Sequence, residues 1–164
     1  MTQLHPVTQL PKYRTKIAAD WIDYNGHLRD AYYGLIFSCA TDDMMDRVGL
    51  HAEYRARTRC TLYTLEMHLH FLHEVKSSDE VAVQISILAF DRKRIHVSAV
   101  FSCERLGDPV ASAEAMMLHV QQNDKPASTP FPAHIQEKLA ALVMDPLMHA
   151  TKIPGSRKIE LQRR

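Results

Sequence analysis

Apolar and polar residues alternate along this chain with two different periods. Residues 30–48 have the periodicity of a helix, and the first ten helical positions, 31–40, are almost entirely apolar. A helix that is apolar on nearly all sides is usually buried. We therefore predict a buried helix over residues 30–48, with Asp30 as its N-cap because its carboxylate can accept from free backbone N–H groups. Gly49 suits the end of this helix.

Residues 60–74, 80–90, 94–104 and 110–121 instead alternate with the period of two that predicts β-strands. A short first strand is predicted at 13–21, and a short helix at 134–143 follows a proline-rich loop at 126–132. Within the first of the four long runs, the alternation predicts two faces. One face carries Tyr63, Leu65, Met67, Leu69 and Phe71, and the other carries Glu66, His68 and His70.

The order of elements is strand, buried helix and then four strands with the spacing of an antiparallel meander. We predict an α+β fold in which an antiparallel sheet wraps around one long central helix, since this buries both economically. One sheet face would stay uncovered, which predicts a homodimer or homotetramer. The predicted organisation is an N-terminal extension at 1–12, one domain at 13–145 and a polar C-terminal tail at 146–164, which we expect to fray.

Composition excludes several classes of function. The 164 residues suit one domain, and 46% hydrophobic with 24% charged residues is typical of a soluble globular protein. A net charge of +1 gives no field that would attract a nucleic acid or an anionic membrane. No apolar run approaches the roughly 20 residues that span a bilayer, and residues 1–12 lack the apolar core of a signal peptide. With three widely spaced cysteines and no paired motif, we expect reduced thiols and a cytoplasmic protein.

A compact motif precedes the central helix: Asp23-Tyr24-Asn25-Gly26-His27-Leu28. Asn-Gly favours a turn, because both residues adopt positive φ at low cost. Together with the tyrosines at 32 and 33 and the apolar helix, the motif resembles that of the hot-dog-fold thioesterases of the 4-hydroxybenzoyl-CoA type. Their signature is Asp-x-(Asn/Gly)-Gly-(His/Val)-Val at the start of the central helix. The resemblance covers about residues 13–122 and implies a hot-dog fold and hydrolysis of an acyl-CoA thioester.

A narrower likeness points to one branch of these enzymes. Three segments are similar to the thioesterases of carnitine catabolism, which act on betainyl-CoA and occur beside, or fused to, carnitine dehydrogenase. Arg29 departs from the broader signature, where asparagine is more usual, and this leaves the local hydrogen bonds at the start of the helix in doubt. The segments are residues 21–33, Tyr63-Thr64-Leu65-Glu66 and Leu72-His73-Glu74-Val75.

The resemblance implies a role in catalysis for three residues. Asp23 could attack the thioester carbonyl and form a mixed anhydride, or it could deprotonate a water molecule. The backbone N–H of Asp30 is the expected oxyanion donor, with that of Ala31 beside it. His27 would orient the turn or the substrate, and the alternative for His27 is a purely structural role. From the residues alone, the favoured interpretation of Asp23 is instead a turn aspartate that accepts hydrogen bonds from the Asn25-Gly26 backbone.

The expected substrate sets further requirements. Asn25 and Gly26 would shape the loop around the substrate. A betainyl group carries a quaternary ammonium without N–H donors, which aromatic faces and a carboxylate recognise. Basic residues at a turn between two strands would bind the CoA phosphates, although such turns are often merely solvated. The candidates for the acyl pocket are Trp21, Tyr24, Tyr32, Tyr33, Tyr63 and Glu66, and those for CoA are Arg92, Lys93 and Arg94.

The sequence is also compatible with functions other than thioester hydrolysis. Candidate metal ligands are present at His68, His70 and His73, but no matching ligand set occurs elsewhere in the sequence. We therefore expect no metal, and no cofactor other than the CoA of the substrate. A non-catalytic acyl-CoA sensor is one alternative. A dehydratase of the same fold with His27 as its base is a second, and a structural module is a third. Loss of acyl-CoA hydrolysis on replacing Asp23 separates the thioesterase from all three.

Overall fold

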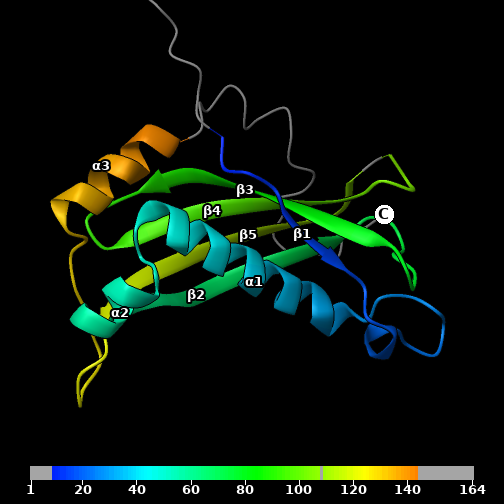
Figure 1. Cartoon of the computed structure of the whole chain (residues 1–164), viewed down its shortest axis with the longest axis horizontal. Coiled ribbons are helices and arrows are strands. Elements are labelled where there is room, and N and C mark those ends of the chain that lie inside the picture. Colours follow the sequence, from blue (N-terminus) through cyan, green and yellow to red (C-terminus); the bar gives the residue numbers. More distant parts are fainter. Residues whose placement is uncertain (1–8, 108, 144–164) are drawn as a thin grey trace, which may run out of the picture.

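The computed structural model describes residues 9–107 and 109–143. One antiparallel sheet and a long helix laid across it make up most of this part of the chain (Figure 1). The strands are β1 (Tyr13–Lys16), β2 (Cys60–Phe71), β3 (Glu80–Phe90), β4 (Arg94–Cys103), β5 (Pro109–Gln121) and β6 (Ala127–Ser128). The helices are α1 (Asp30–Val48), α2 (Ala52–Thr58) and α3 (Ala133–Leu142), and a short 3-10 helix covers Ala19–Trp21. The predicted α+β arrangement, a sheet around one central helix, is confirmed.

The strand order is β1-β3-β4-β5-β2, with the two-residue β6 beside β5. The predicted meander therefore holds for β3, β4 and β5 only. β2 pairs with β5 at the far edge of the sheet and does not pair with β3. The reason is the connection at residues 72–79, which carries the chain across the end of the sheet instead of making a tight hairpin.

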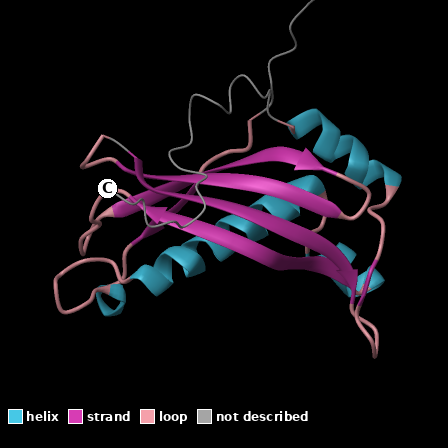
Figure 2. Cartoon of the chain, turned by 180° about the vertical axis from the view of Figure 1, so that it is seen from behind, coloured by secondary structure: helices cyan, strands magenta, loops and turns pink. Residues whose placement is uncertain are grey.

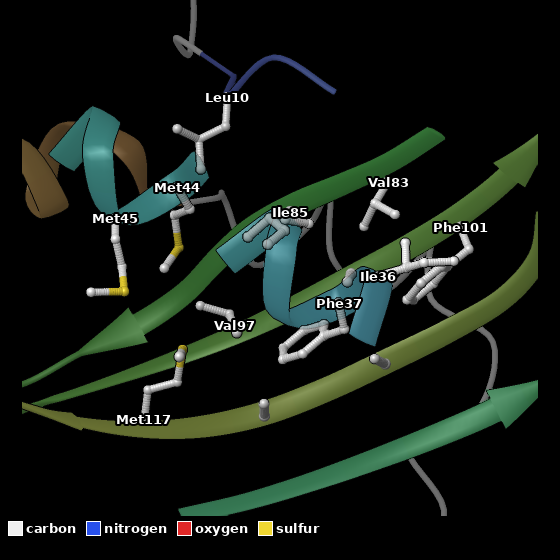
Figure 3. Packing of buried hydrophobic residues seen from close by; sticks show 14 of the residues in the cluster. Leu10, Ile36, Phe37, Met44, Met45, Val83, Ile85, Val97, Phe101 and Met117 are labelled. Carbon is white, nitrogen blue, oxygen red and sulfur yellow. The ribbon is translucent and has the colours of Figure 1, made fainter. Parts of the chain in front are cut away.

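α1 covers one face of the sheet, as Figures 1 and 2 show from opposite sides. Ile36 and Phe37 point from α1 towards the apolar residues of β3 and β4 (Figure 3). The predicted buried helix is buried on one side only within this chain, because the sheet covers that side and leaves Leu35 43% exposed. The side of the sheet away from α1 carries polar and charged side chains between apolar ones.

Helix α1 has the predicted bounds, but its cap differs from the prediction. Arg29 is the N-cap residue, without a side-chain cap, and Asp30 is the first helical residue. The Asp30 carboxylate accepts from the neighbouring N–H of Ala31 at 2.8 Å instead of capping from outside the helix. Gly49 ends the helix with φ of 99°, as the prediction for this glycine requires.

The ends of the first two strands differ from the prediction. β1 stops at Lys16, because the chain turns into the 3-10 helix that ends at Trp21. β2 stops at Phe71, since the N–H groups of Leu72 and His73 both donate to the carbonyl of Val110 and turn the chain away. The connection between α1 and β2 contains α2, and the predicted proline-rich loop contains β6.

A β-bulge in β2 changes which of its side chains share a face. The pairing with β5 shifts between Thr64 and Glu66, so that Leu65 is the extra residue. After the bulge, Met67, Leu69 and Phe71 lie opposite residues of β5 that face α1. Tyr63 lies before the bulge, opposite Leu118, and shares the other face with Glu66, His68 and His70. The predicted common face of Tyr63 and Met67 is therefore wrong.

Two predictions fall partly or wholly outside the described residues. The predicted domain boundary at 145 and the predicted tail at 146–164 lie outside the described residues. Most of the predicted N-terminal extension also lies outside them. The predicted helix at 134–143 is confirmed as α3 within one residue at each end. Within the described ranges, none of the helices has both the length and the hydropathy needed to cross a membrane.

Candidate active site

The motif before α1 forms a closed loop that is held by its own backbone. The N–H of Asp23 donates to the carbonyl of His27 at 2.8 Å, and the N–H of Gly26 donates to the carbonyl of Asp23 at 3.0 Å. Gly26 has φ of 80°, which a side chain would disfavour. The N–H of Arg29 returns to the carbonyl of Trp21 at 3.0 Å. These bonds present Asp23 immediately before the first turn of α1.

The carboxylate of Asp23 is held at one oxygen and open at the other. Oδ1 accepts from the backbone N–H of Asn25 at 2.8 Å and from that of His27 at 3.2 Å. Within the described part of the chain, Oδ2 has no hydrogen-bond partner. The His27 N–H, more than that of Asn25, lowers the pKa of Asp23 below its ordinary value. Asp23 therefore enters any reaction at neutral pH as a carboxylate with one free oxygen.

The first turn of α1 supplies a free backbone donor beside this loop. The N–H of Asp30 has no acceptor among the described residues, whereas that of Ala31 donates to the Asp30 carboxylate. The N–H of Tyr32 donates to the carbonyl of Arg29 at 3.0 Å. Of the two N–H groups predicted as oxyanion donors, only that of Asp30 is available in this arrangement, and it lies at the positive end of the helix dipole.

The connection after β2 closes the site from the other side. The N–H of Leu28 donates to the carbonyl of Val75 at 2.7 Å, and His27 forms a β-bridge with Lys76. This pairing brings the Nε2 of His27 to 3.0 Å from the Oε2 of Glu74. The two segments and the start of α1 border an open cavity of about 480 Å³. It is lined by Asp23, Tyr24, His27, Leu28, Arg29, Asp30, Tyr33, Phe71, Leu72, His73, Glu74 and Val75.

Two of the predicted pocket aromatics line this cavity. The ring of Tyr33 is buried and packs edge-to-face on Phe71, with centroids 5.1 Å apart, and burial raises the pKa of Tyr33 to about 12. Tyr24 also lines the cavity but is 94% exposed. Trp21 and Tyr32 stack on one another at 5.1 Å and are not among the lining residues.

The predicted carboxylate of the acyl pocket lies elsewhere in this chain. Glu66 pairs with His68 at 2.8 Å on the sheet face away from α1, and Tyr63 shares that face. Glu66 lies beside the pair formed there by His96 and Glu114, whose Nε2 and Oε1 atoms are 2.6 Å apart. Within one chain, neither Tyr63 nor Glu66 reaches the cavity that contains Asp23, so their role in substrate binding stays a prediction.

The predicted CoA-binding residues surround a second hollow. Arg92, Lys93 and Arg94 line a cavity of about 600 Å³ together with Leu118 and Pro130. Arg94 is held by Asp91 at 2.6 Å, and the Nζ of Lys93 donates to the hydroxyl of Ser128 at 3.0 Å. Figure 1 shows this β3–β4 hairpin at the end of the sheet near α3, whereas the Asp23 loop lies at the opposite end. A single chain therefore does not bring the two sets together.

Sequence reasoning missed part of the cavity wall. Phe71, Leu72, His73 and Glu74 line it, yet the alternation of β2 only grouped Phe71 with other apolar residues on one face, and Glu74 was assigned no role. Glu74 lies far from Asp23 in sequence, and only the backbone pairing of residues 27 and 28 with 75 and 76 brings it to His27. Among the described residues, no cluster of three or more histidine, cysteine or acidic side chains has the arrangement of a metal site.

Comparison with known proteins shows the family of this chain. The model of the thioesterase-like superfamily matches residues 17–139. A betainyl-CoA thioesterase of Pseudomonas aeruginosa is 44% identical over 133 residues, which are 81% of this chain and 83% of that protein. A longer protein of Rhizobium meliloti, an L-carnitine dehydrogenase/betainyl-CoA thioesterase, is 34% identical over 125 residues, which are 76% of this chain and 25% of that protein.

A solved structure shares the arrangement of elements as well as the sequence. It is a hypothetical protein of Staphylococcus aureus in complex with CoA, with a TM-score of 0.80 and 27% identity. The match covers 93% of this chain and 96% of that one. The fold is thus the hot-dog fold that the sequence predicted, and the chain belongs to the thioesterase-like superfamily.

Proposed function

We propose that this chain hydrolyses betainyl-CoA to betaine and CoA in the degradation of carnitine. The observation that carries this proposal is the meeting of two groups at one cavity. The carboxylate of Asp23 has a free oxygen, and the N–H of Asp30 has no acceptor among the described residues. These are the groups that thioester hydrolysis requires. The relative of 44% identity supports the choice of acyl group.

Asp23 takes one of two roles in this proposal. As a nucleophile, its Oδ2 forms a bond to the carbonyl carbon, the CoA thiolate leaves, and water then hydrolyses the mixed anhydride. As a general base, it removes a proton from a water molecule that attacks the same carbon. In both routes the N–H of Asp30 donates to the oxygen that becomes negative. The backbone bonds of Asn25 and His27 fix the orientation of the carboxylate and keep it ionised.

The CoA moiety extends away from this cavity, and we propose that a second copy of the chain completes its binding site. Arg92, Lys93 and Arg94 of a single chain lie at the far end of the sheet. β2 is an edge strand of the sheet and leaves Leu65 55% exposed and Met67 37% exposed. An exposed apolar edge strand favours pairing with another chain. The same proposal includes the homodimer or homotetramer and the cytoplasmic location predicted from the sequence.

The proposal is tested by release of free thiol from a panel of acyl-CoAs. The panel contains betainyl-, acetyl-, long-chain and aryl-CoA, each assayed with the wild-type protein and with Asp23→Asn. We expect the highest kcat/KM for betainyl-CoA and a loss of activity in Asp23→Asn. Preference for a neutral acyl group would keep the thioesterase and remove betainyl-CoA as its substrate.

One alternative deserves the same assay, because Asp23 Oδ1 accepts the two backbone bonds of an ordinary turn aspartate. In a non-catalytic sensor, the cavity would bind acyl-CoA without hydrolysing it. Binding of acyl-CoA with no release of thiol from any substrate would favour the sensor and contradict the enzyme.

A further inference from the structure

We propose that Glu74 is the specificity-determining residue of this site, and that its carboxylate recognises the positive charge of the acyl group. This inference rests on the proposed function. It assigns the charge recognition to a residue on the connection after β2, in place of Glu66, which lies on the sheet face away from α1.

The chemistry of the substrate limits where this charge can lie. In a betainyl thioester, a single methylene separates the ammonium nitrogen from the reacting carbonyl carbon. When that carbon lies beside Asp23 and its oxygen beside the N–H of Asp30, the ammonium must lie in the same cavity. Glu66 is separated from this cavity by the sheet within one chain. Within this chain, the recognising carboxylate must therefore come from the cavity wall.

Among the described residues, three acidic side chains line the cavity: Asp23, Asp30 and Glu74. Asp23 is assigned to the chemistry, and its Oδ1 is bound to the loop backbone. The Asp30 carboxylate is bound to the N–H of Ala31 at the start of α1. Glu74 pairs with His27 through Oε2 alone, and its Oε1 has no partner within the described ranges. Glu74 thus offers a carboxylate oxygen that neither the loop nor the helix uses.

An aromatic ring lies on the same wall. Phe71 lines the cavity, is 53% exposed, and is held edge-to-face against Tyr33 with an interplanar angle of 74°. A trimethylammonium group has no N–H to donate, so it is bound by contact with aromatic carbon and by a nearby negative charge. Phe71 and Glu74 supply both from one short segment of the chain.

A competing role for Glu74 is to position His27, whose own backbone N–H binds Asp23. The two roles differ in their dependence on charge. Glutamine keeps an oxygen that can accept from His27 but removes the negative charge. A neutral substrate of the same shape, 3,3-dimethylbutanoyl-CoA, has carbon in place of the ammonium nitrogen. A positioning role affects both substrates alike, whereas charge recognition affects only betainyl-CoA.

The experiment measures kcat/KM for betainyl-CoA and for 3,3-dimethylbutanoyl-CoA in four proteins: wild type, Glu74→Gln, Glu74→Asp and Glu114→Gln. Glu114 is the matched control, because it forms a similar pair with His96 at 2.6 Å but lies outside the Asp23 cavity. The ratio of interest is kcat/KM for betainyl-CoA divided by kcat/KM for 3,3-dimethylbutanoyl-CoA. We expect Glu74→Gln to lower this ratio about three- to tenfold, as is typical of a partly exposed charge contact. Glu74→Asp, which keeps the charge, should retain most of the ratio, and Glu114→Gln should leave it unchanged.

The outcomes separate this inference from the function on which it rests. If wild type prefers betainyl-CoA and Glu74→Gln leaves the ratio unchanged, or lowers both values equally, the inference is wrong and the proposed function stands. If wild type hydrolyses the neutral analogue at least as well as betainyl-CoA, the proposed substrate is wrong and the inference is wrong with it.

Discussion

The two oxygens of the Asp23 carboxylate have different surroundings. Oδ1 is bound by the backbone N–H groups of Asn25 and His27, while Oδ2 has no partner among the described residues. Asp23 can therefore hold the turn and take part in catalysis at the same time, because the turn uses only one of its carboxylate oxygens. The sequence offered these roles as alternatives. The motif predicted the residue and the turn, but only the structure shows that one oxygen of the carboxylate has no partner among the described residues.

The same bonds predict how Asp23 titrates. Two backbone donors favour the charged carboxylate, so its pKa lies below the ordinary value of about 3.9. The ¹³C carboxyl shift of Asp23, assigned by its absence in Asp23→Asn, should have a midpoint below that value. A midpoint above it would mean that desolvation outweighs the two hydrogen bonds, and would contradict this description of the carboxylate.

At the scale of elements, the connection after β2 is held in place by an ion pair. The Nε and Nη2 atoms of Arg105 donate to the two oxygens of the nearly buried Asp79 at 2.8 and 2.7 Å. Asp79 also accepts from the N–H of Lys76, and Arg105 reaches the carbonyl of Glu74 at 3.3 Å. These contacts fix the segment that carries Glu74 and closes the cavity.

Replacing Asp79 tests this anchor. Arg105, as the largest cause, lowers the pKa of Asp79 to about 2. Because the folded pKa lies below the unfolded value of about 3.9, the stabilisation is present above that pH and is lost as the pH falls towards 2. Asp79→Asn should lower the free energy of unfolding in urea at pH 7 by about 1–3 kcal/mol.

The pH dependence and a control sharpen this prediction. The difference between wild type and Asp79→Asn should shrink as the pH falls from about 4 to about 2. Asp43→Asn breaks a pair with Arg47 along α1 that is more exposed, and it should cost no more than about 0.5 kcal/mol. Equal effects of the two substitutions at pH 7 would contradict the anchoring role of Asp79.

Periodicity predicted the helix and most strand bounds. It could not predict the bulge in β2, or that the loop before α1 pairs with the connection after β2. A period of two assigns Tyr63 and Met67 to one face, and the extra residue Leu65 separates them. Likewise, no local pattern indicates that Leu28 pairs with Val75. The sequence therefore predicted the loop and the start of α1, which depend on local structure, but not the long-range pairing that supplies the rest of the cavity wall.

At the scale of the molecule, the cavity and the basic hairpin lie at opposite ends of one sheet (Figure 1). The long edge strand β2 runs between these ends and exposes apolar side chains, among them Leu65 and Met67. Leu35 on α1 is also exposed within this chain. A second copy bound at this edge would cover these residues, and for an isologous pair the same strand would serve both subunits.

A charge at this edge should therefore separate the subunits. Leu65→Glu should convert the wild-type oligomer to a monomer and lower thioesterase activity with it, as measured by sedimentation velocity and thiol release. Ala56→Glu, a charge placed at an exposed position of α2, should change neither. An oligomer that survives Leu65→Glu, or a wild-type protein that is monomeric, would contradict assembly through β2.

The central claim is that Asp23 performs the chemistry, and the most direct test is the rate of CoA release from betainyl-CoA by Asp23→Asn. Asp20→Asn, an exposed aspartate in the 3-10 helix just before the loop, is the control. With both variants folded, Asp23→Asn should fall about 10²–10⁴-fold below wild type, as loss of an acid–base or nucleophilic group does. Asp20→Asn should match wild type. Activity of Asp23→Asn within about threefold of wild type, far above the range for loss of such a group, would contradict the account.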